Sequence, residues 1–469
     1  MEESNKIDRQ LDDWIDSHAG EIVETAQGLI RIPSVKGEPA EMAPYGVETV
    51  RALEFVLDVS RRYGLTTRNL DGHAVHAQWK PANVAENADI VGVLAHVDVV
   101  PAGDGWKHPP FGAEIDGEIL YGRGAVDDKG PAIAALYAIL AVKETGVPLN
   151  KRIRLILGAD EESGFGCVTH YFAREEMPAT GFTPDATFPV VYAEKGISNL
   201  RVTFDTDLRA GKLSVKSLSA GLRANMVPDS AEIVLTGGSD DIEKLLQALP
   251  PSANVKLNPA GDEAAIAAPG KSAHGSKPED GINAFAVLIE ALIQAGAEIP
   301  AILSRAYAWA KDTTGGEFGI AGEDAVAGPL TSNLGIVDYR NGNLNLTFNV
   351  RYPVTWTIED LIERAAPEIE KYGGILVDYA GQKPLYAPET DPLLAVLMNV
   401  YRDFTGDNSP PRTMGGGTYA RVMRKGVAFG PEFDGASGGA HQPDEHWPVD
   451  HMIQSAKIYA RALARLASK

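Results

Sequence analysis

The chain has 469 residues, of which 44% are hydrophobic and 23% charged, a composition typical of a folded protein with a sizeable core. Its 64 acidic and 43 basic side chains give a formal net charge of −21, which repels nucleic acids and anionic membrane surfaces. The single cysteine, Cys167, excludes an intrachain disulfide and a thiolate metal cluster and favours a reducing compartment. Because the sequence shows neither a signal peptide nor an apolar run of membrane-spanning length, we expect a cytoplasmic protein without a nucleic-acid or membrane partner.

The first 194 residues alternate between helical and strand patterns. Apolar residues at helical spacing predict a surface helix over 7–32, which Pro33 ends, and a second helix over 46–63. A further helix begins at Gly130-Pro131. Apolar runs predict strands over 89–95, 117–121 and 152–157. This alternation indicates an α/β sheet that helices cover on both faces.

The pattern changes after about Glu194, where apolar and polar residues begin to alternate. Such alternation predicts strands over 200–204 and 344–350. An amphipathic helix is expected over 283–295, so the middle of the chain indicates a separate α+β domain. The proline-rich passage 383–392 is typical of a linker, and a last amphipathic helix follows, for which we expect Asp450 to be the N-cap.

Candidate metal ligands follow the predicted strands. His96 and Asp98 lie on the same side of an extended chain at the end of strand 89–95, so that Asp98 can orient the imidazole. Open α/β sheets bind ligands at this end of their strands, although a His-x-Asp pair alone is more often structural. Asp127 and Asp128 precede a helix, where one acid suffices as a cap and the other remains for a second role.

Three adjacent acids, Asp160, Glu161 and Glu162, follow the strand 152–157. A nearby cation would relieve the repulsion among their carboxylates, whereas in a solvated loop the repulsion would be screened. The position of these acids at the same strand end as His96 favours the cation.

Two further segments supply candidate ligands. Asp185 precedes an apolar run, and His441 and Glu445 lie in a glycine-rich loop, where backbone can approach a ligand closely. Imidazoles and carboxylates without a thiolate suit Zn²⁺, Mn²⁺ or Co²⁺. Three carboxylates and two imidazoles are too many for one tetrahedral zinc ion, but they suit two ions about 3.5–4 Å apart that share a carboxylate. The pattern therefore predicts a two-metal hydrolase.

These segments, in this order, resemble metallopeptidase family M20, and within it the PepV-like bacterial dipeptidases. The resemblance extends from the first helix to the last and rests on five motifs, namely His96-Val-Asp98, Gly122-Arg-Gly-Ala-Val-Asp127-Asp-Lys-Gly130, Glu161-Glu162, Asp185 and His441. It implies an α/β catalytic domain of the phosphorylase/hydrolase-like (zinc exopeptidase) type, interrupted by an α+β lid domain. We expect the catalytic domain over 1–194 and 382–469 and the lid over 195–381.

The resemblance also implies roles for the motif residues. Two divalent ions, Zn²⁺ or else Mn²⁺ or Co²⁺, would share one bridging aspartate. The implied ligands are His96, Asp127 and Asp185 for the first ion, and Asp127, Glu162 and His441 for the second. Glu161 is the implied general base. Asp98 is expected among the catalytic residues because it can orient His96.

Lid residues that match substrate-binding positions of the family are Asn225, His274 and Arg351. Arg351 shares its strand face with Thr347 and Asn349, opposite the lid core, where an arginine is more often solvent-facing, so the resemblance alone gives it a role. In PepV-like enzymes the run that holds Gly416 and Gly417 lies near the substrate carboxylate.

The implied activity is hydrolysis of short unblocked dipeptides, with β-alanyl dipeptides as one substrate class. Metal-activated water would give its proton to Glu161, His274 would stabilise the oxyanion, and Arg351 with Asn225 would hold the C-terminal carboxylate. The alternatives are another M20-type amidohydrolase, such as an N-acyl amino acid deacylase, desuccinylase or carboxypeptidase, and a metal-binding module without turnover. The large lid favours the PepV-like group, in which the lid is thought to act within its own chain, so the resemblance implies a monomer, with a dimer as the alternative.

Overall fold

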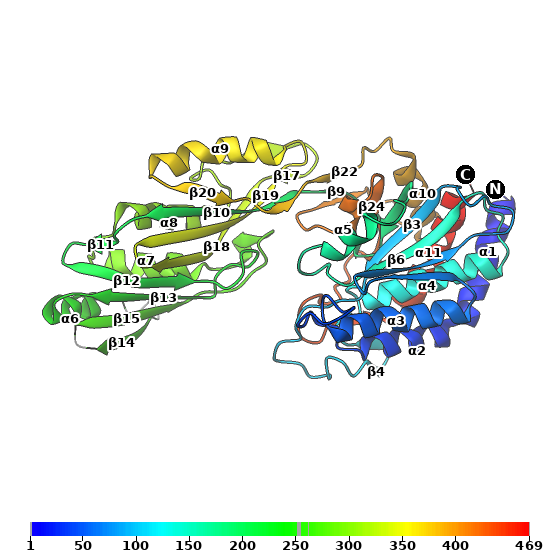
Figure 1. Ribbon diagram of the computed structural model, residues 1–469, viewed down its shortest axis with the longest axis horizontal. Coiled ribbons are helices and arrows are strands. Elements are labelled where there is room, and N and C mark those ends of the chain that lie inside the picture. The colour runs from blue at the N-terminus through cyan, green and yellow to red at the C-terminus, as the bar shows by residue number, and fades with distance from the viewer. Residues whose placement is uncertain (1, 251–254, 261, 469) are drawn as a thin grey trace. The chain divides into compact units, whose positions relative to one another are not determined.

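The computed structural model describes residues 2–250, 255–260 and 262–468. The chain forms two compact units, each with its own hydrophobic core. The first unit comprises Met1–Tyr192, Ala387–Arg412 and Thr418–Lys469, and the second comprises Ala193–Tyr386 with Thr413–Gly417. The middle of the chain, green to yellow in Figure 1, therefore interrupts the first unit.

A nine-stranded sheet runs through the first unit in the order β1-β2-β6-β3-β7-β24-β9-β22, and β23 pairs with β9. Its strands are β1 (Thr66–Leu70), β2 (Ala74–Trp79), β3 (Ile90–His96), β6 (Arg152–Gly158), β7 (Thr180–Thr183), β9 (Val191–Glu194), β22 (Leu385–Tyr386), β23 (Arg412–Met414) and β24 (Gly426–Ala428). The central strands β6, β3, β7 and β24 are parallel, whereas β1 and β2 are antiparallel additions. β3 and β6 are buried along their whole length, as expected of parallel strands covered on both faces.

Helices and short strands complete the first unit. The helices are α1 (Glu2–Ser17), α2 (Ala19–Ile30), α3 (Val47–Arg62), α4 (Lys129–Glu144), α5 (Gly166–Phe172), α10 (Pro392–Thr405), α11 (Val449–Ala467) and the 3₁₀ turn η3 (Tyr419–Val422). The short strands are β4 (Glu114–Asp116), β5 (Ile119–Tyr121) and β26 (His446–Pro448), which form one sheet, and β8 (Ala186–Thr187) with β25 (Pro431–Glu432). α4 and α11 pack on β3 and β6. α4 is buried almost all round, because its sequence is apolar on every face.

The N-terminal segment forms two helices rather than the single helix expected over 7–32. α1 and α2 meet at His18, whose amide donates to the carbonyl oxygen of Ile15 at 3.0 Å. In a continuous helix that amide would donate to Trp14, but the hydroxyl of Ser17 donates to the Trp14 carbonyl at 2.7 Å and His18 Nδ1 lies 2.8 Å from it. Side chains of this kind compete with the helical backbone, which accounts for the break.

The last helix begins one residue before Asp450, so the expectation that Asp450 is its N-cap is wrong. Pro448 holds the N-cap position of α11, and Asp450 lies in the first turn. There its carboxylate accepts from the His451 amide at 2.9 Å, and a negative charge is favoured by the helix dipole. The Val449 amide, which has no acceptor within the helix, donates to the carbonyl of Glu118 at 2.9 Å.

The second unit holds a ten-stranded antiparallel sheet in the order β14-β15-β13-β12-β18-β19-β10-β20, with β11 beside β12 and β21 beside β10. Its strands are β10 (Gly196–Asp205), β11 (Arg209–Ala210), β12 (Leu213–Ala220), β13 (Ser230–Thr236), β14 (Lys256–Ala260), β15 (Glu263–Pro269), β18 (Thr331–Arg340), β19 (Asn343–Tyr352), β20 (Ile375–Asp378) and β21 (Gly381–Gln382), and β16 (Glu323–Asp324) pairs separately with β17 (Gly328–Pro329). The predicted strands 200–204 and 344–350 lie within β10 and β19, which pair with Leu200 opposite Phe348.

The helices of the second unit are α6 (Ser239–Ala248), α7 (Ala284–Gln294), α8 (Ala301–Lys311), α9 (Ile358–Lys371) and the 3₁₀ turn η2 (Pro278–Asp280). α7 packs on β13 and β15, α8 on β18, and α9 on β10 and β20, so the core lies between helices and sheet. The Asn283 side chain accepts from the Phe285 amide at 3.0 Å and caps α7, which confirms the helix predicted over 283–295.

The expected fold class, an α/β unit with an inserted α+β unit, is confirmed by the two sheets and their helices. Within the described ranges, every helix is too short or too polar to cross a membrane.

Candidate metal centre and substrate-binding residues

His96 ends strand β3, and its imidazole is buried at the carboxyl edge of the first unit's sheet. Its Nδ1 atom lies 2.9 Å from the backbone carbonyl oxygen of Asp98 and 3.7 Å from the Asp98 carboxylate. The nearer partner is thus the carbonyl rather than the carboxylate that the sequence suggested. The carboxylate instead accepts from the amides of Glu161 and Glu162, both at 3.1 Å. Asp98 therefore joins the end of β3 to the loop that carries the two glutamates.

Asp127 lies between two imidazoles that are far apart in the sequence. Its Oδ1 atom is 3.0 Å from Nε2 of His96, and its Oδ2 atom is 3.0 Å from Nε2 of His441. The same His441 nitrogen lies 3.1 Å from Oε1 of Glu162, and the His96 nitrogen lies 3.9 Å from Oδ2 of Asp185. Each oxygen of Asp127 thus faces one imidazole, and a further carboxylate lies beside each imidazole.

Two overlapping groups of side chains have ligand atoms that all lie within 4.8 Å of one another. One group is His96, Glu161 and Asp185, and the other is His96, Asp127 and Glu162. With His441, the five predicted ligands and the predicted base all come together in the first unit. The elements that carry them are β3, the loop before α4, the loop after β6, the segment between β7 and β8, and the loop before β26.

The chemistry of this cluster fits divalent cations. Glu161 Oε1 is a buried oxygen that has no hydrogen-bond partner among the residues described. Burial and the nearby charge of Asp185 raise the pKa of Glu161 well above its usual value, and a nearby cation would offset both effects. Carboxylates and imidazoles are ligands that Zn²⁺, Mn²⁺ and Co²⁺ accept, and an unpartnered buried carboxylate oxygen is what a cation would satisfy.

The carboxylates of the cluster favour the charged form of both histidines. Burial opposes the charge on His441, but its hydrogen bonds to Asp127 and Glu162 raise its pKa to about 11. Burial likewise opposes the charge on His96, and Asp127 and Asp185 nevertheless raise its pKa well above 6.5. Divalent cations could replace these protons as the positive partners of the carboxylates, with neutral histidines as ligands.

Asp160 has a different place from the one its sequence suggested. It belongs to the run of three acids that favoured a cation, but its carboxylate turns into its own loop. Oδ1 accepts from Lys36 Nζ at 2.7 Å and from the Ser163 hydroxyl at 2.8 Å, and Oδ2 accepts from the Gly166 amide at 3.0 Å. Asp160 thus shapes the turn that presents Glu161. The spacing Asp160-x-x-Ser163, typical of a side-chain-stabilised turn, was the signal in the sequence.

The predicted lid residues lie together within the second unit. The Gly275 amide, next to His274, donates to the carbonyl of Asn225 at 2.7 Å. A Cβ atom on Gly275 would stand 2.7 Å from the Asn349 side chain, so backbone and side chain meet closely there. His274 Nδ1 lies 2.7 Å from the Ser276 hydroxyl.

Arg351 is buried, although the sequence alone favoured a solvent-facing side chain. Its Nε donates to Oδ1 of Asn349 at 2.9 Å, and its Nη1 donates to the carbonyl of Gly415 at 3.1 Å. Gly415 begins the run that holds Gly416 and Gly417, and all three belong to the second unit. The second unit therefore gathers Asn225, His274, Arg351 and the glycine run at neighbouring positions.

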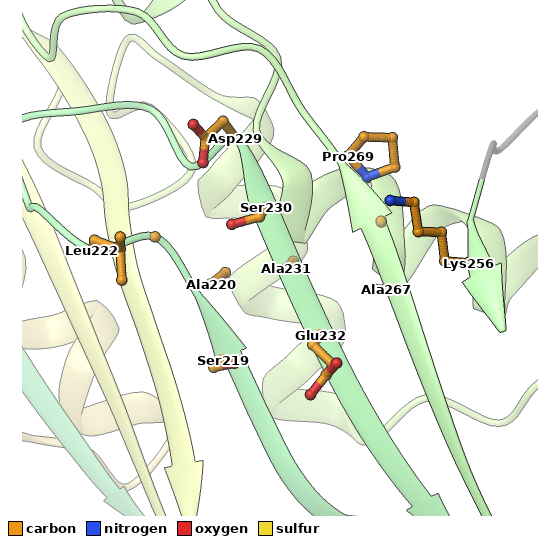
Figure 2. Close-up of a pocket in the computed structure, with 12 residues that line it drawn as sticks. Ser219, Ala220, Leu222, Asp229, Ser230, Ala231, Glu232, Lys256, Ala267 and Pro269 are labelled. Carbon is orange, nitrogen blue, oxygen red and sulfur yellow. The ribbon is translucent and has the colours of Figure 1, made fainter. Parts of the chain in front are cut away.

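A cavity of about 550 Å³ in the second unit lies elsewhere. Figure 2 shows that side chains of β12, β13 and β15, with Lys256 of β14, line it on the face of the sheet. Predicted site residues are absent from its described lining.

Comparison with known proteins gives the same assignment for most of the chain. The family model of peptidase family M20/M25/M40 matches residues 92–465. A Bacillus subtilis (strain 168) protein named "Putative dipeptidase YtjP" is 40% identical over 467 residues, which cover 95% of this chain and 97% of that protein.

Two solved structures share the fold at low sequence identity. Human carnosine dipeptidase 1 is 16% identical with a TM-score of 0.58, and the alignment covers 99% of both chains. The Bacillus subtilis protein YXEP, described as a dinuclear metal binding peptidase from the M20 family, is 10% identical with a TM-score of 0.51, covering 96% of this chain and 99% of YXEP. The expected resemblance is confirmed: the chain belongs to peptidase family M20/M25/M40 and is a metallopeptidase.

Proposed function

We propose that the protein is a dipeptidase that uses two divalent metal ions to hydrolyse short unblocked dipeptides. The observation that carries this proposal is the position of Asp127, which presents one oxygen to His96 and the other to His441 at 3.0 Å each. A carboxylate with this environment suits a bridge between two cations. On this proposal His96 and Asp185 complete the first metal site, and the second takes Glu162 and His441.

Glu161 is the proposed general base and, later, the general acid. Bound divalent ions would supply Lewis acidity, which eases deprotonation of water and favours negative charge on the carbonyl oxygen. Glu161 would accept the proton of the attacking water at its unpartnered Oε1 and then deliver it to the leaving amine. The Asp98 carboxylate accepts a hydrogen bond from the Glu161 amide at 3.1 Å, and this contact would keep Glu161 in place.

The second unit would act as the lid domain and bind the substrate. Arg351, held by Asn349 and Gly415, offers a guanidinium suited to the C-terminal carboxylate, and Asn225 with Gly416 and Gly417 would share that task. His274 would stabilise the oxyanion. A fixed site for the C-terminal carboxylate limits the length of the substrate and favours dipeptides, as does the name of the Bacillus subtilis relative. Zn²⁺ is the proposed metal.

A substrate panel tests this function. The chain is stripped with a chelator, reloaded with Zn²⁺ or Mn²⁺, and assayed on unblocked dipeptides, β-alanyl dipeptides, N-acetyl amino acids and tripeptides. We expect metal-dependent hydrolysis of unblocked dipeptides in preference to the other classes. Preferred cleavage of N-acetyl amino acids would instead identify an amidohydrolase, and binding of metal without any turnover would identify a binding module.

A further inference from the structure

Glu445, a candidate ligand by its place in the sequence, is a fully buried carboxylate beside the candidate metal centre. Its Oε1 atom accepts from the amides of Gly124, Val126 and Asp127 at 3.0, 3.1 and 3.2 Å. Its Oε2 atom accepts from Nη1 of Arg123, also buried, at 2.5 Å. A buried carboxylate is stable only when its oxygens accept hydrogen bonds in this way. All four donors to Glu445 lie between Arg123 and Asp127, so this side chain holds one short segment.

The segment that Glu445 holds carries Asp127, and the loop that contains Glu445 carries His441. The Glu445 backbone adds to this connection, because its carbonyl accepts from the Gly122 amide at 2.9 Å. The loop has an unusual backbone, since His441 and Asp444 both adopt left-handed conformations with φ of 65° and 57°. Such conformations persist only where surrounding contacts fix them.

We propose that Glu445 is a positioning residue that sets the affinity of the protein for divalent cations. It would do so by holding Asp127 and His441, two proposed ligands more than 300 positions apart in the sequence, in a fixed relation. Because those ligands come from the proposed function, the inference rests on that proposal. Groups that orient metal ligands typically contribute 10–100-fold to metal affinity. Glu445 would be such a group, because one of its oxygens holds three amides of the segment that carries Asp127.

Two matched double variants of the full chain separate the amide contacts from the buried charge. Arg123→Met with Glu445→Gln removes both charges but keeps an oxygen for the three amides. Arg123→Met with Glu445→Leu removes both charges and that oxygen. Both variants avoid an unpaired buried charge, which favours folding, and the leucine variant in addition leaves the three amides without their acceptor. We expect the leucine variant to bind Zn²⁺ about 10–100-fold more weakly than the glutamine variant, which should bind nearly as the wild type does.

Zn²⁺ affinity is measured by competition with a chromogenic chelator, so the readout does not depend on turnover. The single variant Glu445→Gln offers a second test, because its amide must point an N–H group at either Arg123 or the backbone amides. With Arg123 present, the N–H group meets another donor in either orientation, so this variant should also lose about 10–100-fold in affinity, and unchanged affinity would overturn the role of Glu445 if the leucine variant does not fold.

Glu175→Gln is the matched control. Glu175 accepts from Arg154 Nη1 at 3.3 Å and also pairs with Arg68. Glu175 and Arg154 are largely buried in the same unit, and the partners described for Glu175 include none of the proposed ligands. We expect this control to lower stability without changing Zn²⁺ affinity. Equal Zn²⁺ affinity of the two double variants, or an equal loss in the control, would overturn the role of Glu445. A wild-type chain that binds Zn²⁺ but hydrolyses no dipeptide would overturn only the proposed activity.

Discussion

At the scale of single residues, Glu161 and Glu162 are neighbours with different proposed tasks. Glu161→Gln removes the carboxylate that would move the proton but keeps the shape of the side chain. We expect kcat to fall by about 10²–10⁴-fold, with KM and bound Zn²⁺ nearly unchanged. Steady-state kinetics and metal analysis of the same samples measure both quantities.

The contrast with Glu162 makes this prediction specific. Glu162 lies 3.1 Å from His441, so Glu162→Gln should weaken Zn²⁺ binding as well as turnover. Because Glu161 also belongs to a group of atoms close enough to hold an ion, loss of bound metal in Glu161→Gln would show that it is a ligand instead.

His274 offers a second test at this scale, because its neighbours fix its protonated nitrogen. The Ser276 amide, 3.3 Å from Nδ1, can only donate, so Nδ1 accepts and the proton of neutral His274 resides on Nε2. We expect ¹⁵N NMR of histidine-labelled protein to show the Nε2–H tautomer for His274. Ser276→Ala removes the hydroxyl at 2.7 Å, and kcat should fall by up to about tenfold at unchanged KM. A dominant Nδ1–H signal in the wild type would contradict this.

Sequence reasoning at the residue scale succeeded for the motif residues, which are recognised by their type and order, but spacing along a strand did not predict that Arg351 is buried. The type and order of the motif residues predicted that His96, Asp127 and Glu161 would meet, and they do. It failed for the acids whose partners are backbone amides. Asp160 binds its own turn, and Glu445 binds three amides of a distant segment, because loop conformation decides which N–H groups converge.

At the scale of elements, β2 and α5 meet through a buried histidine whose charge is suppressed. Burial, with Arg154 and Arg68 nearby, lowers the pKa of His76 to about 3, and its Nδ1 lies 2.8 Å from the Tyr171 hydroxyl. In the unfolded chain the histidine pKa is about 6.5, so at pH values between 3 and 6.5 His76 binds a proton in the unfolded chain but not in the folded one. Stability from this site is complete above pH 6.5 and is lost as the pH falls towards 3.

The histidine at this junction predicts a measurable change in unfolding. Between pH 6.5 and pH 5 the wild type should lose about 2 kcal/mol of unfolding free energy through His76, at 1.36 kcal/mol per pH unit. His76→Gln cannot titrate and should lack this part of the pH dependence. Urea unfolding of both proteins at the two pH values gives the difference, and equal slopes would disprove it.

α1 and α11 meet through ion pairs in matching helical steps. Asp8, Asp12 and Asp16 on α1 pair with Arg465, Arg461 and Lys457 on α11. Arg461 is largely buried, since its side chain keeps 12% of its exposure, and it also covers the Phe404 ring at 4.9 Å. We expect Arg461→Met to cost about 2 kcal/mol, between the values for surface and buried pairs.

Lys457→Met is the control for this helix pair. Its partner Asp16 keeps 56% of its side-chain exposure, so the loss should stay below about 1 kcal/mol. Urea unfolding at neutral pH compares the variants, and equal losses would show that burial of the Arg461 pair adds nothing. The matched spacing of these charges is visible in the sequence, but their pairing depends on helix docking, which periodicity alone does not define.

At the scale of the whole molecule, the sequence has two hydrophobic patterns, one before and one after about Glu194, and these predicted two kinds of sheet. The strand order could not be predicted, because β6 lies between β2 and β3, and β24 from near the end of the chain pairs with β7. Such pairings join segments that local patterns treat separately. The return of Thr413–Gly417 to the second unit is a similar case, since Lys195 donates from its amide to the carbonyl of Met414 at 3.1 Å.

The separate cores predict separate unfolding of the two units. All the proposed metal ligands lie in the first unit, so Zn²⁺ should stabilise only that unit, by about 2.7 kcal/mol when free Zn²⁺ is 100 times its Kd. We expect calorimetry to resolve two unfolding transitions. The midpoint temperature of one of them should fall when a chelator removes the metal. Phe348→Ala identifies the other, because this buried ring stacks on Phe318 in the second core and its loss should cost about 3–5 kcal/mol there. If the chelator and Phe348→Ala shift the same transition equally, the two units unfold as one, because only a shared transition responds to both changes.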